Sequence, residues 1–111
     1  MTIDDALVAA REFRDERDWT QFHNPKDLAI AVSVEAGELL QCFQWSGEDL
    51  RAVDKKQEMC DELADVIIYC AYLADALGVE TGDVISRKIA KNALKYPVEK
   101  AKGNSKKYTE L

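Results

Sequence analysis

The fold is decided by residues 24–45, which read NPKDLAIAVSVEAGELLQCFQW. Asn24 is a favoured N-cap residue, Pro25 suits the first position of a helix, and Asp27 complements the positive end of the helix dipole. Residues 28–34 are apolar on nearly every side, a pattern typical of a helix surrounded by other helices. This stretch therefore predicts a central helix, and the Ser-Gly pair that follows it is expected to end that helix.

Apolar residues at helical spacing predict three more helices. The first is expected to run from Ile3 to about Arg17, with Thr2 as its cap. The second is expected to run from the end of the polar segment Glu48–Lys56 to about Leu77. The third, capped by Thr81, is expected to end at about Lys95. The polar segment is expected to hold a short helical turn or to lead into the helix after it. No strand alternation and no repeat occurs. The sequence therefore predicts an all-α fold: a four-helix bundle in a single domain over residues 1–111, with a polar tail from about residue 97.

Charge and composition narrow the possible partners. The chain has 15 basic and 21 acidic residues, a net charge of −6, which argues against binding to nucleic acid. No apolar run is long enough to span a bilayer, and the acidic N-terminus lacks a signal-peptide pattern, so no membrane partner and a cytoplasmic location are expected. The three cysteines Cys42, Cys60 and Cys70 form no Cys-x-x-Cys pair and are expected to be buried free thiols.

Two pairs of carboxylates lie on the two central helices. Glu35 and Glu38 are three residues apart, as are Glu62 and Asp65, so each pair shares one helix face. Acidic pairs usually point to water, but these two lie among apolar residues on helices that should pack together. Four carboxylates in one space require protonation or a cation, and oxygen ligands without His or Cys favour Mg²⁺. Spacing alone also allows Glu58 to join Glu62 and Asp65 as the working face.

These residues resemble a known signature. Glu35-Ala36-Gly37-Glu38 and Glu62-Leu63-Ala64-Asp65 are similar to the Glu-x-x-Glu and Glu-x-x-Asp motifs of the MazG-like, all-α NTP pyrophosphatases. The resemblance to the dCTP pyrophosphatase branch covers nearly the whole chain. It includes Glu16-Arg17-Asp18-Trp19, Gln21-Phe22-His23, Phe43-Gln44-Trp45, Asp65-Val66-Ile67-Ile68-Tyr69, Tyr96-Pro97 and the terminal Lys107-Tyr108-Thr109-Glu110-Leu111. Two positions depart from the family pattern: Val34, where many members have Glu, and Ala10, where relatives in this branch can have His.

The resemblance implies a reaction and a set of site residues. The reaction is the Mg²⁺-dependent hydrolysis of a nucleoside triphosphate, dCTP or another dNTP, to the monophosphate and pyrophosphate, in nucleotide pool house-cleaning. The implied Mg²⁺ ligands are Glu35, Glu38, Glu62 and Asp65, and the implied nucleotide pocket comprises Trp19, Phe22, His23, Trp45 and Tyr69. The resemblance also implies a homo-oligomer, with a tetramer favoured over a dimer.

Several residues are assigned roles from their chemistry. Asn24 and His23 are polar enough to contact a base edge or a sugar, although Asn24 is also expected to cap its helix. The side chains of Lys88, Asn92 and Lys95 share one face of the last helix, either as a solvated surface or as contacts for the triphosphate. We expect Glu35 or Glu38 to activate the attacking water.

Two alternative functions fit part of this pattern. The first is a non-catalytic helical module that binds a nucleotide or a protein, and turnover would distinguish it from an enzyme. The second is a phosphoribosyl-ATP pyrophosphatase-like enzyme, against which Trp19 and Trp45 argue.

Overall fold

The computed structural model describes all 111 residues and contains only helices and turns, which confirms the predicted all-α class. The α-helices are α1 (Ile3–Glu16), α2 (Pro25–Gln41), α3 (Lys56–Ala76), α4 (Thr81–Lys95) and α5 (Val98–Ala101). Three 3₁₀ turns are η1 (Trp19–Phe22), η2 (Val53–Lys55) and η3 (Tyr108–Glu110). The chain divides into two compact units, Met1–Gly78 and Val79–Leu111. A single domain stays a prediction. None of the helices combines the length and hydropathy that a membrane span requires.

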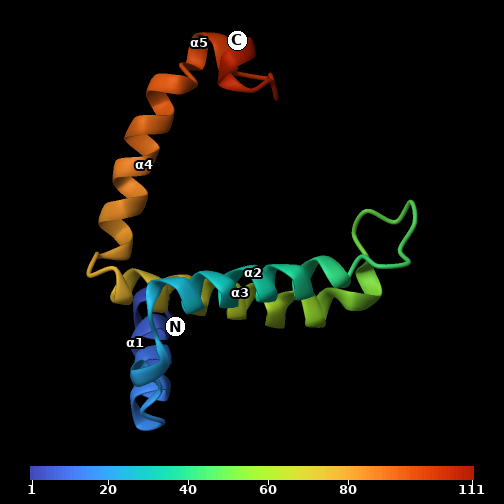
Figure 1. Cartoon of the computed structure of the whole chain (residues 1–111). Coiled ribbons are helices and arrows are strands. Elements are labelled where there is room, and N and C mark those ends of the chain that lie inside the picture. Colours follow the sequence, from blue (N-terminus) through green and yellow to red (C-terminus); the bar gives the residue numbers. More distant parts are fainter. The chain divides into compact units, whose positions relative to one another are not determined.

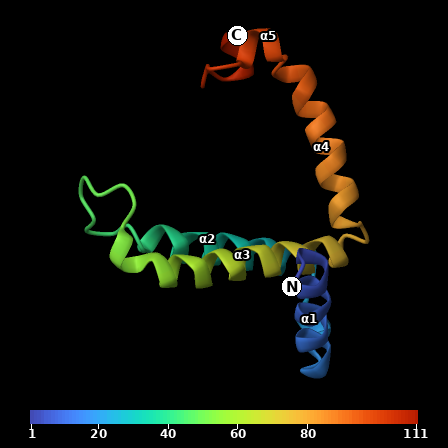
Figure 2. The ribbon, with the colours of Figure 1, turned by 180° about the vertical axis from the view of Figure 1, so that it is seen from behind.

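In the first unit, α2 and α3 form an antiparallel hairpin (Figures 1 and 2), and α1 lies against the end of it where α3 terminates. Residues 42–52, which join the two long helices, lie at the opposite end. The buried apolar side chains are Leu28 of α2, Ala71, Tyr72 and Ala74 of α3, and Cys42 and Ala52 of the segment that joins these two helices. The core of this unit therefore comes from the hairpin and its connecting segment.

The helix starts follow from local capping. The side chain of Thr2 accepts a hydrogen bond from the Asp5 amide at 3.1 Å, and the Asp5 carboxylate accepts one from the Thr2 amide, which completes a capping box. Asn24 caps α2 by accepting from the Asp27 amide at 2.9 Å, as the sequence predicts. The prediction for α4 is wrong by one residue, because Glu80 accepts from the Asp83 amide and Thr81 is the first helical residue.

The end of α2 also differs from its prediction. The helix stops at Gln41 and not near Trp45. Beyond Gln41, the amides of Cys42, Phe43 and Gln44 bond to the carbonyl three residues back, and Trp45 has a φ of 72°, which an α-helix does not accommodate. The prediction that all three cysteines are buried is also wrong, since only Cys42 is buried in the chain.

The second unit is built around α4. Tyr108 of η3 packs edge-on to Tyr96, with ring centroids 5.9 Å apart, and the Lys95 ammonium lies 4.8 Å from the Tyr108 ring centroid. The last residues are therefore attached to the end of α4, and the polar tail contains the additional short helix α5, which the sequence did not predict.

Candidate functional site

The hairpin brings three of the four predicted carboxylates together. Glu35 of α2 and Glu62 and Asp65 of α3 each offer one oxygen, and these oxygens all lie within 4.8 Å of one another. The two helices approach closely at this point because most residues around the acids are small or apolar. The side-by-side helices thus force the acidic faces to meet.

Electrostatics at this group disfavour three free carboxylates. Oε2 of Glu35 and Oε2 of Glu62 are buried without a hydrogen-bond partner. Burial raises the pKa of Glu35 to about 7, and the nearby Glu38 and Asp65 add to the rise. Burial and then Glu38 also raise the pKa of Glu62. Such a group is stabilised by binding either protons or a cation.

A divalent cation fits these residues. The buried carboxylate oxygens accept no hydrogen bond, so a cation would stabilise them. Because all the available ligand atoms are oxygens, a hard divalent ion suits the group. The cluster could therefore hold a metal ion.

Glu38 lies at the rim of this group. Its side chain is exposed, and it faces a separate hollow of about 300 Å³ that Glu58, Asp61 and Glu62 also line. The structure therefore groups Glu35, and not Glu58, with Glu62 and Asp65. Glu58 instead forms an ion pair with Lys55, in which Oε1 of Glu58 lies 3.6 Å from Nζ of Lys55.

An apolar pocket of about 550 Å³ opens directly beside the carboxylates. Glu35 and Asp65 belong to both the acidic group and the pocket wall. The rest of the lining consists of Ala6, Ala9, Ala10 and Phe13 of α1, Trp19 of η1, and Ile68, Tyr69 and Tyr72 of α3. A flat apolar ligand with an anionic group at one end would match this arrangement once the carboxylates hold a cation that the anionic group contacts.

Aromatic rings set the shape of this pocket. Trp19 packs edge-on to Phe13 with centroids 5.6 Å apart, and Tyr69 packs edge-on to Tyr72 at 5.9 Å. Tyr69 lines the pocket together with Glu35 and Asp65. Burial, followed by the charges of Glu35 and other acids, raises the pKa of Tyr69. Tyr69 therefore links the apolar and acidic parts of the site.

Other predicted pocket residues lie outside this pocket within the chain. Phe22 is 65% exposed and Trp45 is 92% exposed, and Trp45 lines a different hollow of about 440 Å³ in the segment after α2. His23 lies behind the pocket, with its ring centroid 5.2 Å from that of Tyr72. Asn24 is occupied as the α2 cap and also donates to the Asp27 carboxylate. Roles for these four residues in nucleotide binding stay predictions.

The cationic face of α4 belongs to the second unit. Lys88, Asn92 and Lys95 lie within this helix, and Lys95 also contacts the ring of Tyr108. Their contact with a triphosphate stays a prediction.

The sequence analysis missed Phe13 and Tyr72 as pocket residues. Tyr72 follows Asp65 by seven residues and Tyr69 by three, so the helical repeat places all three on one face of α3. This spacing could therefore have identified Tyr72 as a pocket residue. The contribution of Phe13 depends on how α1 docks against the hairpin, which no local pattern reveals.

The chain is similar to several known proteins. Residues 30–111 match the MazG-like family. A protein named dCTP pyrophosphatase 1 from Mus musculus is 36% identical over 115 residues, covering 99% of this chain and 68% of that protein. The protein of the same name from Homo sapiens is also 36% identical, with the same coverage. Among solved structures, a pyrophosphatase from Archaeoglobus fulgidus is 40% identical with a TM-score of 0.75, covering 86% of this chain and 92% of that one.

Proposed function

The chain belongs to the MazG-like family, and from that premise we propose that this nucleoside triphosphate pyrophosphohydrolase uses Mg²⁺ to cleave dCTP or another dNTP into the monophosphate and pyrophosphate. The observation that carries the proposal is the shared wall of the site, in which Glu35 and Asp65 belong to both the acidic group and the apolar pocket. A base and a phosphate chain need such adjacent surfaces.

In the proposed site, Glu35, Glu62 and Asp65 would hold Mg²⁺, and Glu38 at the rim would be the fourth ligand. Mg²⁺ bound there would offset the charge of the phosphates and increase the electrophilicity of the phosphorus. No serine, cysteine or histidine lines the pocket that Glu35 and Asp65 share, so we assign the role of nucleophile to water. Glu35 or Glu38 accepts its proton.

The pocket determines which phosphate is attacked. A base between Trp19 and the tyrosines places its sugar near Tyr69, which lines the pocket together with the acids. The first phosphate then reaches the carboxylates. Attack at this α-phosphorus breaks its bond to the bridging oxygen, and pyrophosphate leaves. We propose that Lys88, Asn92 and Lys95, which share one face of α4, contribute further contacts to a triphosphate.

We also propose that the enzyme is a homo-oligomer, with a tetramer favoured over a dimer. Large apolar side chains of the central helices remain exposed in the single chain, among them Ile30, Val34, Leu40 and Leu63. Patches of this kind on a small protein are typical of surfaces that bind another protein. Further copies of this chain would cover them, and light scattering at micromolar concentration would reveal a monomer if the proposal is wrong.

The reaction is tested by product analysis. Incubation with Mg²⁺ and dCTP should release dCMP and pyrophosphate in equal amounts, without dCDP. A parallel incubation with the other natural dNTPs would establish base preference. Formation of dCDP and orthophosphate would refute the position of the cut, and the absence of turnover with every NTP would favour a binding module.

A further inference from the structure

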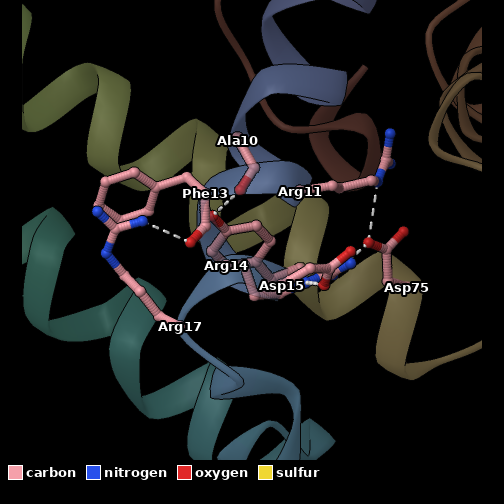
Figure 3. A network of polar contacts seen from close by, with 8 residues as sticks. Ala10, Arg11, Phe13, Arg14, Asp15, Arg17 and Asp75 are labelled. Atoms are coloured by element: carbon pink, nitrogen blue, oxygen red, sulfur yellow. Dashed lines mark hydrogen bonds and ion pairs between the residues drawn. The ribbon is translucent and has the colours of Figure 1, made fainter.

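A polar network attaches α1 to the C-terminal end of α3 (Figure 3). Arg11 Nε and Arg14 Nη1 both donate to Oδ2 of Asp75, at 2.9 and 2.7 Å. The Tyr72 hydroxyl donates to the Ala10 carbonyl at 2.6 Å. These contacts join residues more than sixty positions apart in the sequence.

The network is partly shielded from water. Arg14 is 9% exposed, its guanidinium carbon lies 5.2 Å from the Tyr72 ring centroid, and its Nε donates to Asp15. Burial tends to raise the pKa of Asp75, but the hydrogen bonds and charges of Arg11 and Arg14 outweigh it, and the pKa is lowered overall. Asp75 is therefore a carboxylate between two guanidinium groups, an arrangement that gives strong hydrogen bonds.

Apolar packing contributes less to the docking of α1. Its larger apolar side chains Ile3, Val8 and Phe13 remain 61%, 52% and 46% exposed, and Leu7 is half-buried. Ala6, Ala9 and Ala10 line the open pocket beside the hairpin, and side chains this small bury little area. The contacts made by Asp75 and Tyr72 are thus a substantial part of what fixes α1 in place.

The position of α1 matters because this helix forms one wall of the pocket. Ala6, Ala9, Ala10 and Phe13 all line it, and Phe13 supports Trp19 edge-on. The opposite wall belongs to the hairpin and includes the carboxylates. If α1 moved away from α3, the pocket would open on one side while the acidic group stayed intact.

We propose that Asp75 is a positioning residue for nucleotide binding: through Arg11 and Arg14 it holds α1 against α3, and so maintains the pocket wall for the base. This role rests on the proposed function of the pocket. Asp75 lines only a separate hollow of about 230 Å³ behind Tyr72, so it acts through α1 and not on the substrate.

The test compares Asp75→Asn with Glu12→Gln, which removes one negative charge from an exposed position of α1. Asp75→Asn should raise the KM for dCTP about three- to tenfold and leave kcat within about twofold, because a charged hydrogen bond in a partly exposed site is lost. Inhibition by pyrophosphate in the presence of Mg²⁺, which tests the proposed metal site and not the base pocket, should stay unchanged. Asp75→Glu should restore most of the KM, and Glu12→Gln should behave as the wild type.

Hydrogen exchange supplies a measurement that does not need turnover. Amides of Ile3–Glu16 should exchange about tenfold faster in Asp75→Asn, while those of α2 are unchanged. Equal exchange in α1, or an unchanged KM in an active and folded variant, would overturn the inference. If Asp75→Asn does not fold, Arg11→Gln keeps the Arg14 pair and should raise the KM about threefold, and an unchanged KM would again overturn it. Absence of turnover in the wild type would instead refute the proposed function.

Discussion

The hydroxyl groups of two tyrosines in the same pocket should contribute very differently to stability. Tyr72 is 3% exposed and its hydroxyl donates to the Ala10 carbonyl at 2.6 Å. Tyr69 is less buried, and its hydroxyl has no hydrogen-bond partner in the chain. Tyr72→Phe therefore removes a hydrogen bond between α3 and α1, whereas Tyr69→Phe removes only contacts of the hydroxyl with water.

The expected magnitude follows from this geometry. A net intramolecular hydrogen bond contributes about 1 kcal/mol, and the Ala10 carbonyl keeps its helical partner, so no acceptor is left wholly unpaired. At about 2.1 cal/mol/K per residue, the 111-residue chain has an unfolding entropy of about 0.23 kcal/mol/K. Tyr72→Phe should therefore lower Tm by about 4 °C.

The Tm of both variants is measured by thermal denaturation followed by circular dichroism, at equal protein concentration and without metal or nucleotide. Tyr69→Phe should change Tm by less than about 2 °C. Equal shifts in the two variants would refute the reasoning, because the Ala10 contact would then contribute nothing. A loss of about 4 °C in Tyr69→Phe alone would show that the assignment of the two hydroxyls is reversed.

Three further predictions concern the site. Glu38→Gln and Asp65→Asn should each abolish turnover while the metal-free protein keeps or gains thermal stability, since each removes a repelling charge; activity near that of the wild type in both would contradict the ligand assignment. Trp19→Ala should weaken nucleotide binding by about 1–3 kcal/mol in titration calorimetry if the indole stacks on the base, and unchanged affinity would leave it a packing residue. Burial and the charge of Arg14 lower the pKa of His23 in the folded chain, so between that lowered pKa and about pH 6.5 the unfolded chain binds the proton more readily than the folded chain, and the wild type should lose Tm relative to His23→Gln as pH falls through this range; parallel Tm curves would exclude this effect.

Local chemistry explains why some elements could be predicted to the residue. Asn24 caps α2 through a contact with Asp27 three positions away, and both residues are visible in any short window of sequence. The cap of α4 was predicted to be Thr81, but the adjacent Glu80 can also accept a hydrogen bond from a backbone amide. Only the backbone decides between them: Glu80 has the extended conformation of a cap, with φ −93° and ψ 127°.

The acidic group could be predicted because it depends on two helical repeats and one packing contact. Once α2 and α3 are both central, their acids at three-residue spacing have to meet. The pocket wall is different, because it depends on where α1 docks. Arg14 and Asp75 are 61 residues apart, and nothing near either residue in the sequence indicates the other. Phe13 was therefore not predicted to be a wall of the site.

Trp45 shows how a residue predicted to belong to the site can lie apart from the other predicted residues in one chain. Its backbone has a φ of 72° and its side chain is 92% exposed, in the segment between α2 and α3. An indole ring exposed to water at this position is unfavourable, because its apolar surface is hydrated and not packed. A second protein surface or a ligand that covered the ring would remove this cost. If Trp45 contacts a nucleotide, as the family resemblance implies, either this segment moves or a neighbouring copy presents the ring. The proposed homo-oligomer would supply such a neighbour, and the exposed apolar residues of α2 and α3 and the exposed indole would then share one explanation.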